Sequence, residues 1–423
     1  MGTTFFLAIA IFIATYAIII SEKIHRTVIA LVGAVLMILL GIITQEQAIE
    51  GVDFNTLGLL IGMMVIVGIA KNSGMFQYVA IWAAKAGKGK PINILLILGI
   101  IVALFSAFLD NVTTVLLIIP VIFVICNNLK MDPKVYLISA ILFSNIGGTA
   151  TLIGDPPNIL IGSAAKLSFN DFLFNLAPVI GIITIVSLGL IYLVFRKSLV
   201  ASGDVAKIIA KFKPEEAITD KKLLIKSLFV LGIVIFGFIT HSITHIEGAT
   251  LALAGAALLL LLTMHEPDEH FKNVEWTTIF FFIGLFILVS GLVHIGAIRM
   301  LAEKLLEITQ GDLTKTTLFV LWGSAIFSAI IDNIPFVATM IPLIKDIGAI
   351  SGLSLGPLWW ALALGADLGG NATIIGASAN VVVSGMAEQE GHKITFVEYM
   401  KYALPMTFVA LVISTVYLYV RYL

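Results

Sequence analysis

The chain has 423 residues, of which 59% are hydrophobic and 12% are charged, and its formal net charge is −1. A soluble domain carries about 25% charged residues, so this composition excludes an ordinary soluble protein, and the near-zero net charge gives no sign of a nucleic-acid partner. A single cysteine, Cys126, excludes an intrachain disulfide framework and a cysteine-based metal cluster. The mean hydropathy of +1.08 predicts an integral membrane protein whose main partner is the lipid bilayer.

The apolar segments predict an all-α polytopic membrane protein, since a helix needs about 20 apolar residues to cross a bilayer. In the first half, the pattern predicts spans at 3–20, 28–43, 54–70, 135–165 and 171–195. In the second half, it predicts spans at 224–241, 248–263, 275–291, 357–388 and 396–419. The first apolar run has no basic lead-in and no small-residue cleavage site, so we expect a retained span rather than a cleaved signal.

Two further apolar stretches, 92–126 and 316–347, are predicted to form re-entrant hairpins. Lysines precede the first stretch at Lys88 and Lys90 and follow it at Lys130 and Lys134, so both of its ends are expected on one side of the membrane.

Polar motifs recur at a spacing of 222 residues, as from Asp110 to Asp332. Each hairpin bends at an Asp-Asn pair, and the segment Gly-Gly-Thr-Ala-Thr-Leu-Ile-Gly-Asp-Pro-Pro-Asn at 147–158 has a related counterpart at 369–380. The glycines and prolines are expected to break the helices 135–165 and 357–388. Duplicated halves with broken helices are how secondary transporters build a substrate site at mid-membrane.

The predicted organisation is therefore repeat one at 1–195, a basic linker at 196–223, and repeat two at 224–423. Five spans per repeat would make the two repeats inverted. Basic residues favour the cytoplasmic side; the linker is rich in lysine, and Lys23 and Arg26 would fall on the same side. We expect an inner (plasma) membrane protein with a cytoplasmic linker and both termini outside.

The aspartates at the hairpin tips are the strongest candidates for function. A carboxylate in an apolar segment costs several kcal/mol unless it is paired, solvated or protonated. Asp110 and Asp332 are therefore predicted to carry a coupling ion, H⁺ or Na⁺, helped by Asn111, Asn333 and Thr113. The simpler interpretation is that each aspartate caps the helix after it. The residues predicted to line the substrate and ion sites are Asp110, Asn111, Thr113, Thr114, Asn145, Gly148, Thr149, Thr151, Asp155, Asn158, Asp332, Asn333, Asp367, Gly370, Asn371, Thr373, Ser378 and Asn380.

The two motifs differ at two carboxylates. Asp155 corresponds to Ala377 in the second half, and Asp367 corresponds to Asn145 in the first. This asymmetry predicts that the two halves do not bind identical ligands.

These motifs resemble the ion transporter superfamily, in the branch of arsenite permeases, silicon efflux carriers and the melanosomal pink-eyed-dilution protein. The related sodium symporters of divalent anions share the Gly-Gly-Thr-Ala-Thr-Leu-Ile-Gly and Pro-Pro-Asn elements but resemble Ser-Asn-Thr at the hairpin tips, where this chain has aspartate. The resemblance implies a homodimer, an elevator mechanism with scaffold and transport domains, and two hairpins and broken helices in the transport domain. Some arsenite permeases also use a cytoplasmic ATPase subunit, which the resemblance allows here.

The aspartates bear on the substrate because an ionised carboxylate repels a dicarboxylate, and neither motif contains a lysine or arginine to offset it. The leading prediction is proton- or sodium-coupled efflux of a metalloid hydroxide such as arsenite or antimonite. A sodium/proton antiporter, a sodium-coupled anion or carboxylate carrier, and a passive ion channel remain alternatives. No cofactor beyond the coupling ion is expected. The Gly-x-Gly-Asp signature of intramembrane aspartyl proteases does not precede Asp155 or Asp332, so we do not expect an enzyme.

Overall fold

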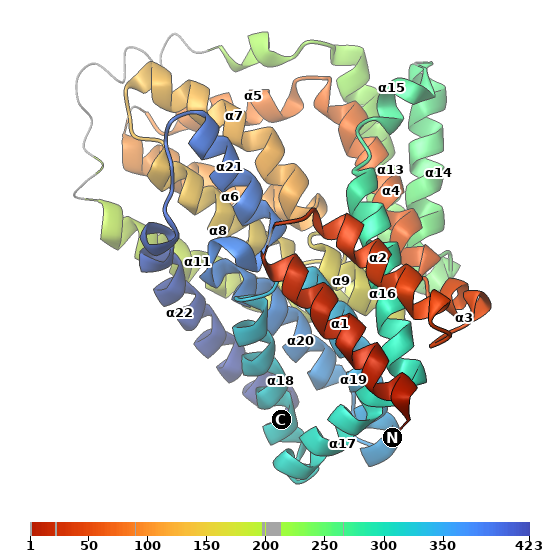
Figure 1. Ribbon diagram of the computed structural model, residues 1–423. Helices are drawn as coiled ribbons and strands as arrows, with labels where there is room; N and C mark the ends of the chain where they lie inside the picture. Colours follow the sequence, from red (N-terminus) through yellow and green to blue (C-terminus); the bar gives the residue numbers. More distant parts are fainter. Residues whose placement is uncertain (1, 22, 89, 197–198, 200–212, 265) are drawn as a thin grey trace.

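The computed structural model describes residues 2–21, 23–88, 90–196, 199, 213–264 and 266–423. Within these ranges, nine helices are long and apolar enough to cross a membrane. The chain is an all-helical, multi-pass membrane protein (Figure 1). Most of the predicted linker, 197–198 and 200–212, lies outside the described residues.

The helices of the first half are α1 (Thr3–Ser21), α2 (Arg26–Leu39), α3 (Gln45–Glu50), α4 (Phe54–Lys71), α5 (Met75–Ala86), α6 (Pro91–Phe108), α7 (Asn111–Leu129), α8 (Lys134–Gly148), α9 (Pro156–Ala165), α10 (Phe169–Asn175) and α11 (Ala177–Phe195). A 3₁₀ turn at Pro214–Ala217 precedes the second half.

The helices of the second half are α13 (Lys221–Thr244), α14 (Gly248–Thr263), α15 (Pro267–Phe271), α16 (Trp276–His294), α17 (Ala297–Thr309), α18 (Leu313–Ser328), α19 (Asn333–Ser351), α20 (Gly356–Gly369), α21 (Ser378–Gln389) and α22 (Phe396–Tyr422). Two 3₁₀ turns, Gly370–Ala372 and Ile374–Gly376, lie between α20 and α21. The starts of α6 and α18 are 222 residues apart, and so are both ends of α7 and α19.

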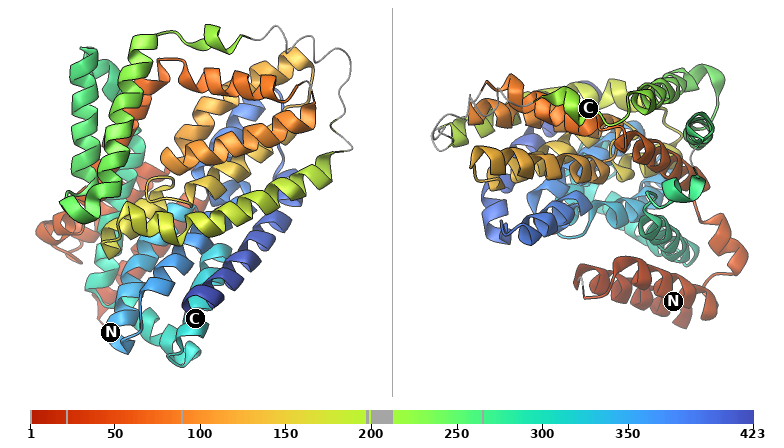
Figure 2. Two further views of the ribbon diagram at one scale, coloured as in Figure 1. Left: turned by 180° about the vertical axis from the view of Figure 1, so that it is seen from behind. Right: turned by 90° about the horizontal axis from the view of Figure 1, so that it is seen from above.

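The helices gather into two groups. In the first, α2 packs along α16 and α4 packs along α14, with α13 beside α14 (Figure 1). In the second, α6 packs on α8 and α18 on α20, and α11 and α22 run side by side on the far face (Figure 2). The outer helices α1 and α13 bury only 28% of their apolar windows, which suits helices that face lipid. We call the first group, together with α1, the α2–α16 group. The second, together with α7, α9, α19 and α21, which pack on it, is the hairpin group.

Glycines allow the hairpin helices to lie against the broken helices. A Cβ on Gly147 of α8 would collide with the backbone of Ala103 in α6, and a Cβ on Gly369 of α20 would lie 2.5 Å from the Cα of Ala325 in α18. Interiors at this density tolerate no added methyl group without movement of the backbone. The Gly-Gly pairs are therefore required by helix packing as well as by the breaks that follow them.

Several predicted boundaries were wrong in detail. The predicted span 28–43 contains a helix of 14 residues, because the chain turns at Leu40 and Gly41, where the φ of Gly41 is +68°. The predicted span 171–195 is two helices, α10 and α11, which are separated at Leu176 because Pro178 has no N–H to donate. The predicted linker extended to residue 223, but α13 begins at Lys221 because Asp220 caps it.

The sequence prediction omitted α5 and α17, which lie between a span and a hairpin in each half. Helix α17 has charged residues on one face, and Ala302 and Leu305 are buried on the other. It is too short and too polar to be recognised as a membrane span from its sequence. Helices α6, α7 and α19 are 18 or 19 residues long and apolar enough to cross a membrane. The re-entrant character of the hairpins and the inversion of the repeats stay predictions.

Candidate functional site

Both tip aspartates cap the helix that follows them. The Asp110 carboxylate accepts hydrogen bonds from the backbone N–H and the hydroxyl of Thr113, at 2.7 and 2.5 Å, so its bonds stay within its own hairpin. The Asp332 carboxylate accepts the backbone N–H of Ile334 at 3.1 Å and the Ser378 hydroxyl at 2.6 Å. The structural interpretation of these residues as N-caps is therefore part of their role, and the two tips are not equivalent.

The same contacts hold the broken helices in both halves. Ser106 Oγ donates to the carbonyl of Ser144, and Ser328 Oγ donates to that of Ala366, both at 2.6 Å. The Thr151 hydroxyl likewise donates to the carbonyl of Ala107, and its counterpart is the bond from Thr373 to the Ala329 carbonyl.

The broken segments are closed by asparagine. Asn380 Nδ2 donates at 2.8 Å to the carbonyls of Gly370 and Thr373. Asn158 Nδ2 makes the corresponding bonds, at 3.4 and 3.0 Å, to the carbonyls of Gly148 and Thr151. The amides thus satisfy carbonyls freed where the helices break. This explains Gly148, Thr151, Asn158, Gly370, Thr373 and Asn380 as residues that shape the site.

Asp155 lies where the two hairpins meet. It is fully buried before the first turn of α9. Its carboxylate accepts Nδ2 of Asn111 at 2.7 Å and Nδ2 of Asn333 at 3.4 Å, one donor from each hairpin tip. Asp155 and Asn333 are 178 positions apart in the chain, and they meet at the Asp155 carboxylate.

A chain of buried amides continues from Asp155 into the second half. Asn111 Nδ2 also donates to Asn145 Oδ1 at 3.0 Å. Asn145 Nδ2 then donates at 2.9 Å to Oδ1 of Asn371 and to Oδ1 of Asn380. We call these side chains, Asp155, Asn111, Asn333, Asn145, Asn371 and Asn380, the central polar cluster.

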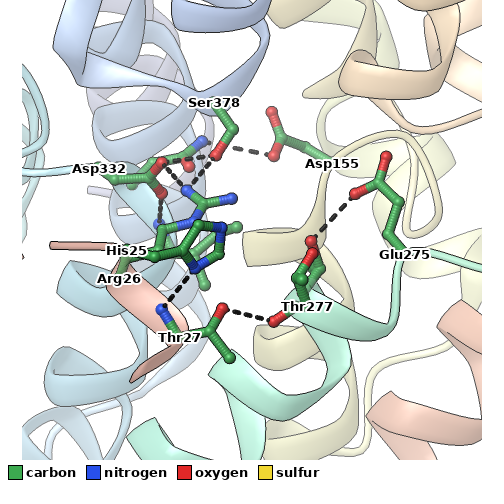
Figure 3. Close-up of polar contacts among 11 residues, drawn as sticks. His25, Arg26, Thr27, Asp155, Glu275, Thr277, Asp332 and Ser378 are labelled. Carbon is green, nitrogen blue, oxygen red and sulfur yellow. Dashed lines mark hydrogen bonds and ion pairs between the residues drawn. The ribbon is translucent and has the colours of Figure 1, made fainter. Parts of the chain in front are cut away.

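Arg26 is a site residue that the sequence prediction placed elsewhere. It was counted as a cytoplasmic loop charge, whereas its Nη1 lies 2.9 Å from Asp332 Oδ2 and donates to Ser378 Oγ at 2.7 Å (Figure 3). The guanidinium also lies over the Phe281 ring, 5.0 Å from its centroid. The expectation that no basic residue offsets the tip aspartates is therefore wrong for Asp332, because α2 from outside both motifs brings one.

A cavity of about 230 Å³ opens beside this ion pair. Its polar lining is Arg26, His25, Asp332 and Ser378, and its remaining walls are isoleucine and valine. Next to the cavity, Tyr16 of α1 donates its hydroxyl to the Pro335 carbonyl at 2.9 Å. The second hairpin, α18 and α19 (hairpin two), is thus joined to α1 and α2 by side-chain contacts.

The other tip has different neighbours. Thr113 lines a smaller cavity of about 80 Å³ with Lys71 of α4 and with Glu275, which precedes α16. The Glu275 carboxylate accepts the Thr278 hydroxyl at 3.0 Å, and near it the Thr27 hydroxyl donates to the Thr277 carbonyl (Figure 3). Asp110 therefore forms no direct hydrogen bond to the central polar cluster. Thr114 is buried on the same helix, and its hydroxyl has no hydrogen-bond partner among the described residues.

Sequence reasoning named every member of the central polar cluster, because five of them lie in the repeated motifs and Asn145 lies two residues before the first Gly-Gly pair. It missed Arg26 because that residue begins α2, far from either motif. In the sequence, Arg26 appears as a basic residue between two apolar segments. An ordinary loop at the membrane surface has the same pattern.

Comparisons with known proteins agree with this architecture. Residues 16–365 match the family described as "Citrate transporter" (CitMHS). An uncharacterized transporter of Mycobacterium tuberculosis is 42% identical over 421 residues, which cover 98% of both chains. A 46 kDa membrane protein of Mycobacterium leprae is 41% identical, with 99% of both chains covered.

A more distant relative and one solved structure extend the comparison. The P protein of Sus scrofa is 34% identical over 98% of this chain but 59% of its own length. The crystal structure of the Alcanivorax borkumensis YdaH transporter, described as having an unusual topology, matches with a TM-score of 0.55 at 13% identity, over 99% of this chain and 98% of that one. The expected relation to the pink-eyed-dilution branch is confirmed by the P protein, whereas the relation to arsenite permeases stays a prediction.

The family match covers most of the chain and the relatives are transporters, so the prediction of a membrane transporter rather than an enzyme is confirmed. The chain belongs to the citrate transporter (CitMHS) family, within the ion transporter superfamily, and is a multi-pass secondary transporter.

Proposed function

We propose that the protein couples solute transport to H⁺ or Na⁺, and that Asp155 holds the coupling ion between Asn111 and Asn333 of the two hairpin tips. The observation that carries this proposal is the position of one fully buried carboxylate between the tips of both hairpins. An ionisable group in the interior of a membrane protein is expensive and is typical of an ion pathway.

The geometry links ion binding to hairpin position. The amide donors of Asn111 and Asn333 bind an ionised carboxylate more strongly than a neutral one. A proton or Na⁺ on Asp155 therefore weakens the hold of the carboxylate on both hairpins at the same time. The tip aspartates are less suited to this task, because Asp110 caps α7 through its bonds to Thr113 and Arg26 pairs with Asp332.

The leading substrate is a neutral metalloid hydroxide such as arsenous or antimonous acid. The central polar cluster offers amide donors and acceptors beside the Asp155 carboxylate. Neutral hydroxyl groups can bind such a surface without the repulsion that an anion would meet. If Asp155 binds H⁺ and Na⁺ in turn and no other solute is carried, the protein would be a sodium/proton antiporter.

A carboxylate carrier is the second candidate, and Arg26 is the observation that favours it. A guanidinium beside a cavity of about 230 Å³ can bind a carboxylate in two parallel hydrogen bonds. The family description, citrate transporter, names such a solute. An anion would have to compete with Asp332 for the same guanidinium.

The transport cycle is proposed to be an elevator in a homodimer, with the hairpin group moving against the α2–α16 group. The two inverted repeats, the cytoplasmic linker and the outward termini belong to the same proposal. A cytoplasmic ATPase subunit is not required by it, because a coupling ion supplies the driving force.

Flux into proteoliposomes tests the proposal. Purified protein is reconstituted, a pH or Na⁺ gradient is imposed, and arsenite and citrate inside the vesicles are measured by mass spectrometry. Wild-type protein should accumulate one solute against its gradient, and so should the control Asp268→Asn, which removes an exposed charge. In Asp155→Asn the coupled flux should fall at least tenfold. Coupled accumulation that survives in Asp155→Asn contradicts the assignment. Downhill ion flux in the wild type, without accumulation of either solute against its gradient, would instead indicate a channel.

A further inference from the structure

Asp367 occupies the position in α20 that Asn145 occupies in α8. In the first half, Asn145 Nδ2 uses its two hydrogens to bind Oδ1 of Asn371 and Oδ1 of Asn380. The residues that correspond to these acceptors in the other half are Thr149 and Asn158, so the repeat places both of them beside Asp367. A carboxylate with no hydrogens thus replaces an amide donor between two oxygen-bearing side chains.

The hydrogens of the two neighbours are already used. The Thr149 hydroxyl donates to the Asn145 carbonyl at 2.8 Å. Asn158 Nδ2 donates to the carbonyls of Gly148, Thr149 and Thr151, at 3.4, 3.3 and 3.0 Å. Among the described residues, no donor lies in hydrogen-bond geometry to either carboxylate oxygen of Asp367 or to Oδ1 of Asn158. Both side chains are fully buried.

Such a group of acceptors is costly in isolation, because buried oxygens without donors lose their hydration and gain nothing in return. The helix ends add to the negative potential. Helix α8 ends at Gly148 and α20 ends at Gly369, and the C-terminal end of a helix favours a positive charge. Carboxylate, amide and hydroxyl oxygens are the ligands that hard cations take, and broken-helix C-termini are used for Na⁺ in transporters.

We infer that Asp367, Asn158 and Thr149 bind a Na⁺ ion, at a site separate from Asp155. The inference goes beyond the proposed function, because it adds a second cation and so a second coupling charge.

The test is Na⁺-dependent thermal unfolding of purified protein in detergent, with choline replacing Na⁺ at constant ionic strength. It uses the Asp155→Asn background, so that only the second site can respond. We expect Asp155→Asn to show a saturable rise in Tm with Na⁺, and Asp155→Asn/Asp367→Asn to show none. Asp155→Asn/Asp268→Asn, which removes an exposed charge, should keep the full response. In Na⁺-free buffer the Asp367→Asn change should not lower Tm, since the new amide supplies the missing donor.

Equal Na⁺ responses with and without Asp367→Asn would overturn the inference, and so would the absence of any response in Asp155→Asn. If the double variant does not fold, Thr149→Val in the Asp155→Asn background removes one ligand oxygen. It should raise the apparent Kd for Na⁺ at least tenfold, and an unchanged Kd would again overturn the site. These measurements need no transport, so their failure leaves the flux experiment on Asp155 to be judged separately.

Discussion

The ion pair of Arg26 and Asp332 is the clearest case in which one residue changes the electrostatics of the site. The side chains are 30% and 13% exposed, so the pair is screened less than a surface pair. It joins the first turn of α2 to the tip of hairpin two, and Ser378 of α21 bonds to both partners. Asp332 is therefore paired with a guanidinium that comes from the α2–α16 group.

A double-mutant cycle measures this coupling. Arg26→Gln and Asp332→Asn should each lower the apparent Tm in detergent, because each leaves a partly buried partner unpaired. The double variant should lose less than the sum, with a coupling energy of about 1–2 kcal/mol. The matched cycle on the exposed pair Arg299 and Glu303 of α17 should show no measurable coupling. Additive losses at Arg26 and Asp332 would mean that the pair contributes only through separate contacts.

What the sequence could predict at this scale follows from where the residues lie. Asp155, Asn111 and Asn333 could be predicted because repetition of a polar motif in an apolar chain marks a site. That Asp155, rather than a tip aspartate, receives a donor from each hairpin depends on tertiary packing. The position of Arg26 depends on packing too, since nothing local distinguishes it from a loop charge.

At the level of elements, the Gly-Gly pairs decide how closely the hairpins approach the broken helices. Gly147→Ala and Gly369→Ala should each destabilise the protein by about 1–3 kcal/mol, because the new methyl group meets the backbone of Ala103 or Ala325. The matched control is Gly189→Ala in α11, where nothing lies within 4 Å of the added Cβ. It should be neutral or stabilising, since alanine is the better helix former.

Apparent Tm in detergent and the yield of monodisperse protein give the readout for these glycine variants. Losses of equal size at Gly147 and Gly189 would show that helix propensity, rather than close approach, governs both positions. The repeat also predicts that the two Gly-Gly positions respond alike, because the contacts of Gly147 and Gly369 fall on corresponding residues of α6 and α18.

Element positions were the most predictable level of the fold. Helix α14 begins and ends where the apolar pattern predicts, at 248–263, and α4 differs by one residue at its end. Hydropathy succeeds here because apolar runs of this length have few alternatives in a bilayer. It failed for α5 and α17, whose amphipathic faces are stabilised by contacts with neighbouring helices and carry no spanning signal.

For the whole molecule, side-chain hydrogen bonds contribute to the contacts between the two helix groups. Asn55 of α4 donates to Ser163 of α9 at 3.3 Å, Tyr16 of α1 bonds to α19, and Arg26 bonds to α19 and α21. Within the groups, by contrast, α4 and α14 or α6 and α8 pack through glycine and alanine. Polar contacts of modest strength suit an interface that must open and re-form.

A reversible crosslink between the groups tests the proposed elevator. In a Cys126→Ala background, Asn55→Cys and Ser163→Cys place two thiols where side chains of α4 and α9 already meet. Oxidation should abolish solute flux in proteoliposomes and reduction should restore it, because the hairpin group can no longer slide along α4. The control pair, Gly58→Cys with Ala249→Cys, joins α4 to α14 inside the α2–α16 group, where a Cβ on Gly58 would lie 3.0 Å from that of Ala249. Flux should survive that crosslink, and flux that also survives the first would mean that α9 does not move against α4 during transport.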